Sequence, residues 1–424
     1  MKVLLLNTSS HTGGAAVAAN RLMKALQKTR INVSMLVLNG VDSNNSVFSV
    51  NSSWIKKELN LFRFYWERII IFLCNHFNRT DLFRVSIANT GNDISDHPLV
   101  KEADIIHIHW INQGFLSLKD LQKLFRLGKP IVWTMHDMWA STGICHYTGD
   151  CEAYQDLCKQ CSYLRSEKNF DLSTKVFLIK RSIYKDADLT FVGCSKWITQ
   201  KAALSNLLVG SNFLSIPNPI DTSIFLGQDK LECRDVLGLP KDKSLILFGA
   251  LNVTDIRKGV KYLLDALSSL NDRNVELVVF GQVKEELRSL VTIPIHSMGY
   301  ITDVHKIVTL YNAVDLFVIS SLEDNLPNTI MESMACGTPC VGFNVGGIPE
   351  MIDHLINGYV ARYKDAEDLA KGISWILNYK DKKSLSDACL KKVRETYAEN
   401  IVAEKYIELY KQLIENNREK KSYE

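Results

Sequence analysis

Two acidic residues, Asp324 and Glu332, flank the start of a predicted helix. They lie eight residues apart, with Asp324 before the helix and Glu332 inside it. The backbone N–H groups at a helix start are unpaired and carry a partial positive charge, which suits a phosphate. A carboxylate one or two turns into the helix cannot contact that phosphate, but it can accept hydrogen bonds from hydroxyls such as a ribose diol. The spacing therefore predicts a nucleotide-linked ligand across the helix start.

Two basic residues, Arg257 and Lys258, open another predicted helix soon after a strand. The helix dipole disfavours a lysine at this place, which argues against a merely solvated role. A lysine here can neutralise a diphosphate, including the charge that develops on it when it acts as a leaving group. The guanidinium group of an arginine can donate two hydrogen bonds to the same diphosphate. We therefore predict that both side chains contact a diphosphate.

A loop of small residues follows the first predicted strand and opens a helix, with Gly13 and Gly14 at its centre. Small residues allow backbone N–H groups to approach a ligand closely. The loop lacks both the G-x-G-x-x-G fingerprint and the lysine of a P-loop. A tight turn without a ligand is an equally good interpretation of the two glycines alone.

Histidines stand at or near the ends of two other predicted strands. His136 follows the strand 131–135 in the sequence WTMHDMW, at the end of a parallel sheet where ligands bind. We predict that it contacts either the sugar of a donor or an acceptor. His107 and His109 alternate on the predicted strand 105–110, and we expect them to face opposite sides, one toward an acceptor and one packed.

Four of the ten cysteines cluster within seventeen residues, at Cys145, Cys151, Cys158 and Cys161. Only the last pair has C-x-x-C spacing, and the other gaps exceed those of common zinc ribbons. In a reducing compartment, clustered thiols bind zinc more often than they form disulfides. A structural zinc, with His146 as a spare ligand, is therefore the favoured interpretation, while disulfides and plain thiols stay open.

Short, nearly continuous apolar runs alternate with helical patterns along the chain, which predicts an α/β fold with parallel sheets buried on both faces. Proline interrupts this alternation at Asn218-Pro219. We therefore predict two Rossmann-like domains, residues 1–218 and 219–396, followed by a helix at about 397–415. The predicted strands are 3–6, 33–38, 105–110, 131–135, 189–194, 213–216, 245–248, 275–280, 316–320 and 340–343.

Length, net charge and the apolar runs of the chain exclude some classes of protein. A length of 424 residues exceeds one hydrophobic core, and a net charge of +3 is too small to indicate nucleic-acid binding. No apolar run is long enough for a membrane span. The first apolar run predicts a buried strand rather than a signal peptide, so we expect a cytoplasmic protein with reduced cysteines.

The segment from Trp54 to Phe83 is rich in aromatic and basic residues. Two interpretations are open for it. An amphipathic helix of this composition can lie in a membrane interface, or it can simply cover a sheet.

Residues 320–350, which read SSLEDNLPNTIMESMACGTPCVGFNVGGIPE, resemble the donor-binding signature of retaining glycosyltransferases of family 4. The linker IPNPID is similar to the linker of the same family, with Pro219 in place of a glycine. The stretch HDMW…TGICHY followed by cysteines is similar to an exopolysaccharide or colanic-acid-type subgroup. The donor-binding domain departs from the family pattern in further places. Asp324 replaces a glutamate, the turn Asn325-Leu326-Pro327 replaces a GFG-like turn, and Ala250 replaces an arginine.

This resemblance, which covers nearly the whole chain, implies a GT-B fold. In that fold two Rossmann-like domains face each other across an interdomain cleft, the first on the acceptor side and the second binding the donor. The C-terminal helix is expected to pack back on the first domain. The implied donor-binding residues are Gly13, Gly14, Arg257, Lys258, Gly299, Tyr300, Ile301, Asp324, Asn325, Leu326, Asn328 and Glu332, and the implied catalytic residues are His136, Lys258 and Asp324.

The implied reaction is retaining transfer of a hexose-type sugar from a UDP- or GDP-linked donor to a glycan or polyprenyl-linked glycan, in bacterial surface polysaccharide synthesis. It requires no cofactor and no catalytic metal. Attachment to the inner face of the plasma membrane is compatible with such an acceptor. Two alternatives remain open: a nucleotide-sugar epimerase of the same fold, and a non-catalytic subunit that only binds the nucleotide sugar.

Overall fold

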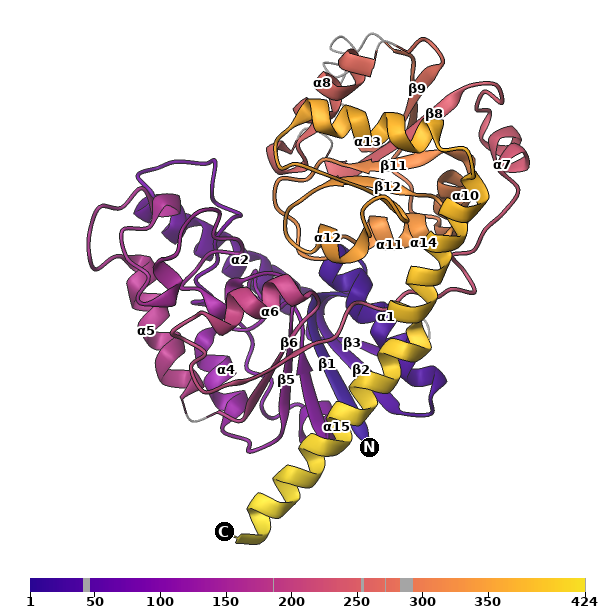
Figure 1. Ribbon diagram of the computed structural model, residues 1–424. Helices are drawn as coiled ribbons and strands as arrows, with labels where there is room; N and C mark the ends of the chain where they lie inside the picture. The colour runs from indigo at the N-terminus through magenta and orange to yellow at the C-terminus, as the bar shows by residue number, and fades with distance from the viewer. Residues whose placement is uncertain (41–45, 186, 253–254, 271, 283–292, 424) are drawn as a thin grey trace. The chain divides into compact units, whose positions relative to one another are not determined.

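The computed structural model describes residues 1–40, 46–185, 187–252, 255–270, 272–282 and 293–423. The chain forms two compact units (Figure 1). Unit 1 comprises residues 1–218 and 402–424, and unit 2 comprises residues 219–401. Ile220 pairs with Ala398 in a parallel bridge, so the chain enters and leaves unit 2 at neighbouring places.

Unit 1 is built on a seven-stranded sheet in the order β3-β2-β1-β4-β5-β6-β7. Every neighbouring pair is parallel. The strands are β1 (Lys2–Ser9), β2 (Asn32–Asn39), β3 (Val47–Ser49), β4 (Ile105–Ile108), β5 (Ile131–Met135), β6 (Leu189–Gly193) and β7 (Asn212–Ser215).

Helices cover both faces of this sheet. On one face, α1 (Gly14–Lys28) and the long α15 (Glu399–Tyr423) form a core with inward side chains of β1 and β2. Tyr406 and Tyr410 of α15 are fully buried in it. The second core, on the other face, takes residues from α4 (Leu118–Phe125), α5 (Leu172–Tyr184) and α6 (Lys196–Ala203). The remaining helical segments of unit 1 are α2 (Trp54–Cys74), α3 (Pro98–Glu102), η1 (Trp139–Ser141), η2 (Ala153–Gln155) and η3 (Ser162–Leu164).

Unit 2 repeats the plan with a six-stranded parallel sheet in the order β10-β9-β8-β11-β12-β13. Its core includes apolar side chains of α8 (Val260–Leu270) and α13 (Ala366–Asn378). The strands are β8 (Ser244–Asn252), β9 (Val275–Gln282), β10 (Ile295–Gly299), β11 (Leu316–Ile319), β12 (Cys340–Phe343) and β13 (Gly358–Ala361). The other helical segments are α7 (Lys230–Leu237), η4 (Ile256–Lys258), α10 (Val304–Ala313), α11 (Asn328–Ala335), α12 (Ile348–Met351) and α14 (Lys382–Thr396).

In both sheets the order of the strands reverses beside the first strand. Strand order runs one way from β1 through β2 and the other way from β1 through β4, and β8 with β9 and β11 does the same. Ligands of open parallel sheets bind beyond the carboxyl ends of the strands at such a point. The loops after β1 and β4 in unit 1, and after β8 and β11 in unit 2, are therefore the places to look for a site.

All ten predicted strands are present, and the α/β fold with two parallel sheets is confirmed. The prediction missed β3, β10 and β13, which are all edge strands. They are short, at three to five residues, and several of their side chains are partly exposed, whereas β7, which is also an edge strand, was predicted from residues 213–216. The C-terminal helix is longer than expected, and strand β4 ends at Ile108 instead of residue 110.

Candidate active site

In unit 2, a lysine and an aspartate from the two switch-point loops form an ion pair. Lys258 ends η4 after β8, and its Nζ lies 2.9 Å from Oδ2 of Asp324, in the loop after β11. The same Nζ is 3.5 Å from Oγ of Ser321, and Ser320 donates a hydrogen bond to the Lys258 carbonyl. Both charged side chains are partly exposed. A basic group is thus held over the carboxyl ends of β8 and β11, within reach of solvent.

Glycines make this close approach of the loops feasible. Gly259 and Gly346 both have positive φ, and a Cβ on either would overlap a backbone carbonyl oxygen, that of Ser320 or of Asp324 respectively. The adjacent Gly347 N–H lies 3.3 Å from the Asp324 oxygen. Any larger residue at 259 or 346 would push the loops apart, so the glycine-rich turn holds the backbone of Asp324 in place.

Helix α11 places the second carboxylate. It begins at Asn328, after Pro327, and has no acidic residue in its first turn. Glu332 lies one turn inside, 9% exposed, and accepts a hydrogen bond of 3.0 Å from the Tyr311 hydroxyl. Burial, together with the neighbouring Glu332, raises the pKa of Tyr311 well above its ordinary value, so Tyr311 stays a donor. The carboxylate of Glu332 is thus held as an acceptor inside α11, and no side chain caps the start of that helix.

The guanidinium of Arg257 binds Asp255. Its Nη2 and Nε lie 2.7 and 3.2 Å from the two carboxylate oxygens. Burial opposes ionisation of Asp255, but hydrogen bonds from Arg257 lower the pKa of Asp255 overall. To bind a diphosphate, the guanidinium of Arg257 would therefore have to exchange its hydrogen bonds with Asp255 for bonds to phosphate oxygens. The other predicted donor contacts differ in exposure: Asn325 and Leu326 are buried, whereas Tyr300 is 63% exposed after the end of β10, with Gly299 and Ile301 beside it.

In unit 1, the glycine loop has the predicted place after β1. Gly13 has a φ of 95° and immediately precedes α1, which begins at Gly14. The Ser9 side chain accepts hydrogen bonds from the backbone N–H groups of His11 and Thr12. The loop is therefore folded onto the end of β1, with its glycines at the helix start.

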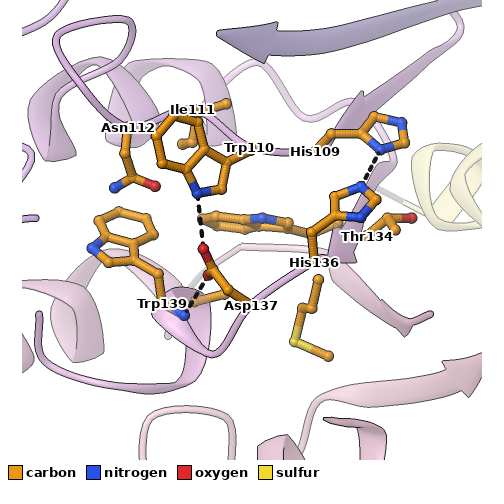
Figure 2. Close-up of a pocket in the computed structure, with 11 residues that line it drawn as sticks. His109, Trp110, Ile111, Asn112, Thr134, His136, Asp137 and Trp139 are labelled. Carbon is orange, nitrogen blue, oxygen red and sulfur yellow. Dashed lines mark hydrogen bonds between the residues drawn. The ribbon is translucent and has the colours of Figure 1, made fainter. Parts of the chain in front are cut away.

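His136 follows β5 and packs within a group of buried rings (Figure 2). Its Nε2 lies 2.9 Å from Nδ1 of His109, and its Nδ1 lies 3.9 Å from Sγ of Cys194. Burial lowers the pKa of His136 to about 4 although the neighbouring Asp137 acts in the other direction. Burial also lowers the pKa of His109 well below its ordinary value. Both imidazoles are therefore neutral near pH 7, and both nitrogens of His136 are directed at unit 1 side chains.

The expectation that His107 and His109 face opposite sides is wrong. Their rings stack with centroids 4.3 Å apart, because side chains along a strand alternate with a period of two and residues two apart share a face. His107 is also bonded to the Tyr410 hydroxyl and to Thr134 Oγ, at 2.6 and 2.7 Å. It therefore ties α15 to the centre of the sheet.

The sequence analysis missed the role of Asp137. This carboxylate accepts hydrogen bonds from Trp110 Nε1, the Trp139 backbone N–H and His146 Nδ1, at 2.8, 2.8 and 2.7 Å (Figure 2 shows the first two). Burial opposes its ionisation, but His146 and these hydrogen bonds lower the pKa of Asp137. A charged aspartate thus orients His146, which was expected only as a spare metal ligand. The cavity among these side chains, of about 10 Å³, has room for one water molecule at most.

The four clustered cysteines are free thiols. Burial raises the pKa of Cys158 to about 12 and that of Cys161 to about 11, and it raises that of Cys145 as well. Within the described residues, no three His, Cys, Asp or Glu side chains are grouped so that they could hold a metal ion. As placed, the thiols do not form a zinc site, and a structural zinc stays a prediction.

Comparison with known proteins points to one class of enzyme. A family model described as "Glycosyl transferases group 1" matches residues 242–379. This segment contains β8, Lys258, β11, Asp324 and α11, which are the elements of the unit 2 site.

Curated relatives carry related names. The chain is 25% identical over 286 residues to a "Putative colanic acid biosynthesis glycosyl transferase WcaC" of Escherichia coli strain K12, covering 65% of each chain. It is 30% identical over 165 residues to the N,N'-diacetylbacillosaminyl-diphospho-undecaprenol alpha-1,3-N-acetylgalactosaminyltransferase of Campylobacter jejuni, covering 38% of this chain and 43% of that enzyme. The chain thus spans about two thirds of the first relative and less than half of the second.

Solved structures extend the likeness to the whole chain. A glycosyltransferase from Rickettsia africae matches with a TM-score of 0.66 and 18% identity, over 98% of this chain and 99% of that one. Anabaena HepE, solved with UDP and glucose, matches with a TM-score of 0.63 and 16% identity, over 97% of this chain and all of that one. The chain has the GT-B fold. At these identities the likeness establishes the fold, and the chemistry has to be argued from the site.

Proposed function

We propose that this protein is a retaining glycosyltransferase of family 4 that moves a hexose-type sugar from a UDP- or GDP-linked donor to a glycan or polyprenyl-linked glycan. The observation that supports this most is the ion pair of Lys258 with Asp324 beside the start of α11, with Glu332 inside that helix. Lys258 with the start of α11, Asp324 and Glu332 match the three chemical parts of such a donor, which are the diphosphate, the sugar and the ribose respectively.

The roles follow from the charges and positions of these groups. Lys258 and the N–H groups at the start of α11 would hold the diphosphate, and Lys258 would exchange part of its contact with Asp324 for a phosphate oxygen. Asp324, released in this way, would accept hydrogen bonds from sugar hydroxyls. Glu332 would accept hydrogen bonds from the ribose, and Arg257 would support the diphosphate after leaving Asp255.

The remaining predicted residues would contact the base, the diphosphate and the sugar of the donor. The backbone of residues 299–301 would hold the base. From unit 1, Gly13 and Gly14 would approach the diphosphate, and His136 would contact the sugar. Because His136 is neutral and its ring is engaged within unit 1, we assign it a contact and no proton transfer.

The reaction consists of one substitution at the anomeric carbon. The bond from this carbon to the phosphate oxygen breaks, and its electron pair leaves with the nucleoside diphosphate. The acceptor hydroxyl oxygen then bonds to the same face of the sugar, and its proton passes to the departing phosphate oxygen. Lys258 stabilises the negative charge that grows on this oxygen, so the scheme uses no metal or other cofactor.

The class of acceptor rests on the relatives. The Campylobacter enzyme is named for an acceptor on diphospho-undecaprenol, and the Escherichia coli relative for colanic acid biosynthesis. We propose a similar glycan or lipid-linked glycan here, as part of bacterial surface polysaccharide synthesis.

A panel of UDP- and GDP-sugars tests the proposal. The purified protein should release nucleoside diphosphate from one donor faster when polyprenyl-diphosphate-linked sugars are supplied, with the α or β configuration of the donor kept in the product. Sugar interconversion without an acceptor would identify an epimerase. Tight binding of one donor without turnover on any acceptor would identify a non-catalytic subunit.

A further inference from the structure

Helix α2 of unit 1 turns polar side chains inward. Three of its four buried residues are polar, namely Asn60, Glu67 and Arg68. Glu67 pairs with Arg68 at 2.7 Å and accepts three hydrogen bonds from the segment 86–88. Arg68 also donates to the Val85 carbonyl. These contacts hold the helix on unit 1 through its polar side, which is the reverse of a helix that covers a sheet.

The opposite side of α2 is apolar and exposed. Six side chains separated by four, three, four, three and four residues form one face of the helix. Each is between 44% and 62% exposed. This apolar stripe consists of Ile55, Leu59, Phe62, Trp66, Ile69 and Leu73.

Further apolar side chains extend the stripe. Trp54, at the start of the helix, is 75% exposed, and Phe77, just beyond its end, is 66% exposed. Tyr65 is 55% exposed, and the rings of Phe62 and Trp66 stack on the surface with centroids 6.1 Å apart. Monomeric water-soluble proteins rarely expose so many contiguous apolar groups, so a partner is expected to cover them.

The charges around the stripe are mainly positive. Residues 54–84 contain six Lys or Arg and three Asp or Glu, a balance of 6 − 3 = +3. Glu67 is buried against Arg68, and Asp81 lies 3.5 Å from Arg84. Lys56, Lys57 and Arg79 are exposed. This face therefore complements an anionic surface.

We propose that α2 lies in the surface of a bilayer with anionic headgroups, with its apolar stripe at the boundary of headgroups and acyl chains. Aromatic and aliphatic side chains on one face with lysine and arginine beside them are the composition of an interfacial helix. Of the helices in the described ranges, none is long and apolar enough to cross a membrane, so α2 lies along the surface. A second copy of the chain fits less well, because a symmetric contact would bring like charges together.

This surface depends on lipid contact alone and is independent of the proposed transfer reaction. The test is flotation of the full chain with vesicles of phosphatidylethanolamine and phosphatidylglycerol, and with neutral phosphatidylcholine vesicles. The wild-type chain should bind the anionic vesicles at least tenfold more tightly, and rising salt should weaken the binding.

Two variants and one control separate the contributions. Phe62→Gln, Trp66→Gln and Ile69→Gln together should lower binding to anionic vesicles at least tenfold. Lys56→Gln with Lys57→Gln should reduce the preference for anionic over neutral lipid. The control replaces three exposed apolar residues outside α2, Val209, Leu231 and Val236, by glutamine and should bind as the wild-type chain does.

Two results would overturn the proposal. One is vesicle binding that the triple α2 variant leaves unchanged. The other is a dimer in light scattering that the triple variant dissociates, without vesicle binding by the wild-type chain. Equal far-ultraviolet circular dichroism and equal thermal unfolding of all variants show that they are folded. Vesicle binding without sugar transfer would refute the proposed reaction and leave the lipid surface standing.

Discussion

The carboxyl edges of the two sheets share a topology and differ in their chemistry. In unit 2, the edge carries charges in contact with one another, Lys258 with Asp324 and Arg257 with Asp255, and each pair is partly exposed. In unit 1, the edge carries stacked neutral imidazoles, His109 and His136, and the carboxylate of Asp137, which accepts three hydrogen bonds.

This difference indicates which ligand each edge can take. Exposed ion pairs are weak in water, so a diphosphate can replace one partner at little cost. The imidazoles of His109 and His136 are neutral near pH 7, so they neither attract nor repel an anion. They suit hydroxyl groups, which exchange hydrogen bonds with neutral donors and acceptors. The two edges thus differ in their chemistry although the sheets repeat one plan.

The largest expected effect is on turnover. Lys258→Ala should lower kcat about 10²- to 10³-fold with a smaller change in KM, because the charge it meets grows in the transition state. Lys261→Ala, which removes an exposed lysine at the second position of α8, is the matched control and should leave both constants nearly unchanged. Steady-state kinetics on the best donor decides. A rise in KM alone would make Lys258 a binding residue and weaken the contrast between the edges.

The next effect is on nucleotide affinity. Glu332→Ala should cost about 1.5–3 kcal/mol of binding to the nucleoside diphosphate, because a charged hydrogen bond to hydroxyls is lost. That is about 10- to 150-fold in Kd by calorimetry. Tyr311→Phe removes the other partner of Glu332 and keeps the carboxylate, so it should change Kd less than threefold. Equal affinities for wild type and Glu332→Ala would refute the ribose assignment.

The two edges should also respond differently to acid. Burial holds the pKa of His107 at about 3 and that of His136 at about 4, against about 6.5 when unfolded. Above pH 6.5 neither state binds these protons. As the pH falls from 6.5 toward 4, the unfolded chain binds them first, so unit 1 loses about 2 kcal/mol per histidine at pH 5.

Hydrogen exchange at pH 7 and pH 5, corrected for intrinsic rates, measures this loss in each unit. Protection of β4 and β5 should fall more than that of β8 and β11. His136→Gln should reduce the difference by about one histidine's share. An equal loss of protection in both sheets would show that the buried imidazoles do not set the acid response.

The smallest expected effect concerns metal content. We predict one zinc per chain on the cysteine cluster, with no part in the chemistry. Elemental analysis of protein purified without added metal should find it, and Cys158→Ser should remove it. Cys233→Ser, a buried cysteine in unit 2, should not. Four titratable thiols without metal would agree with their present arrangement and rule the site out.

Strands and helix starts that depend on residues close together in the chain could be predicted from the sequence. The inner strands appear as continuous apolar runs because they are buried on both faces. Asp324 stands before α11 and Glu332 inside it because helix starts are encoded within a few residues. Lys258 follows β8 for the same reason. The strands β3, β10 and β13 were missed because they are only three to five residues long and offer no long apolar run.

Only the tertiary structure decided which distant residues meet. The sequence gives Lys258 and Asp324 as separate candidates, but folding brings them to 2.9 Å across 66 positions of the chain. Asp137 with His146, and His107 with Tyr410 of α15, are contacts of the same kind. Even the amphipathic pattern of α2 did not reveal which side faces inward, because the partners of Glu67 lie in a separate loop. Local sequence determines the elements and the residues they carry, whereas long-range packing determines which side chains share a site and which remain exposed.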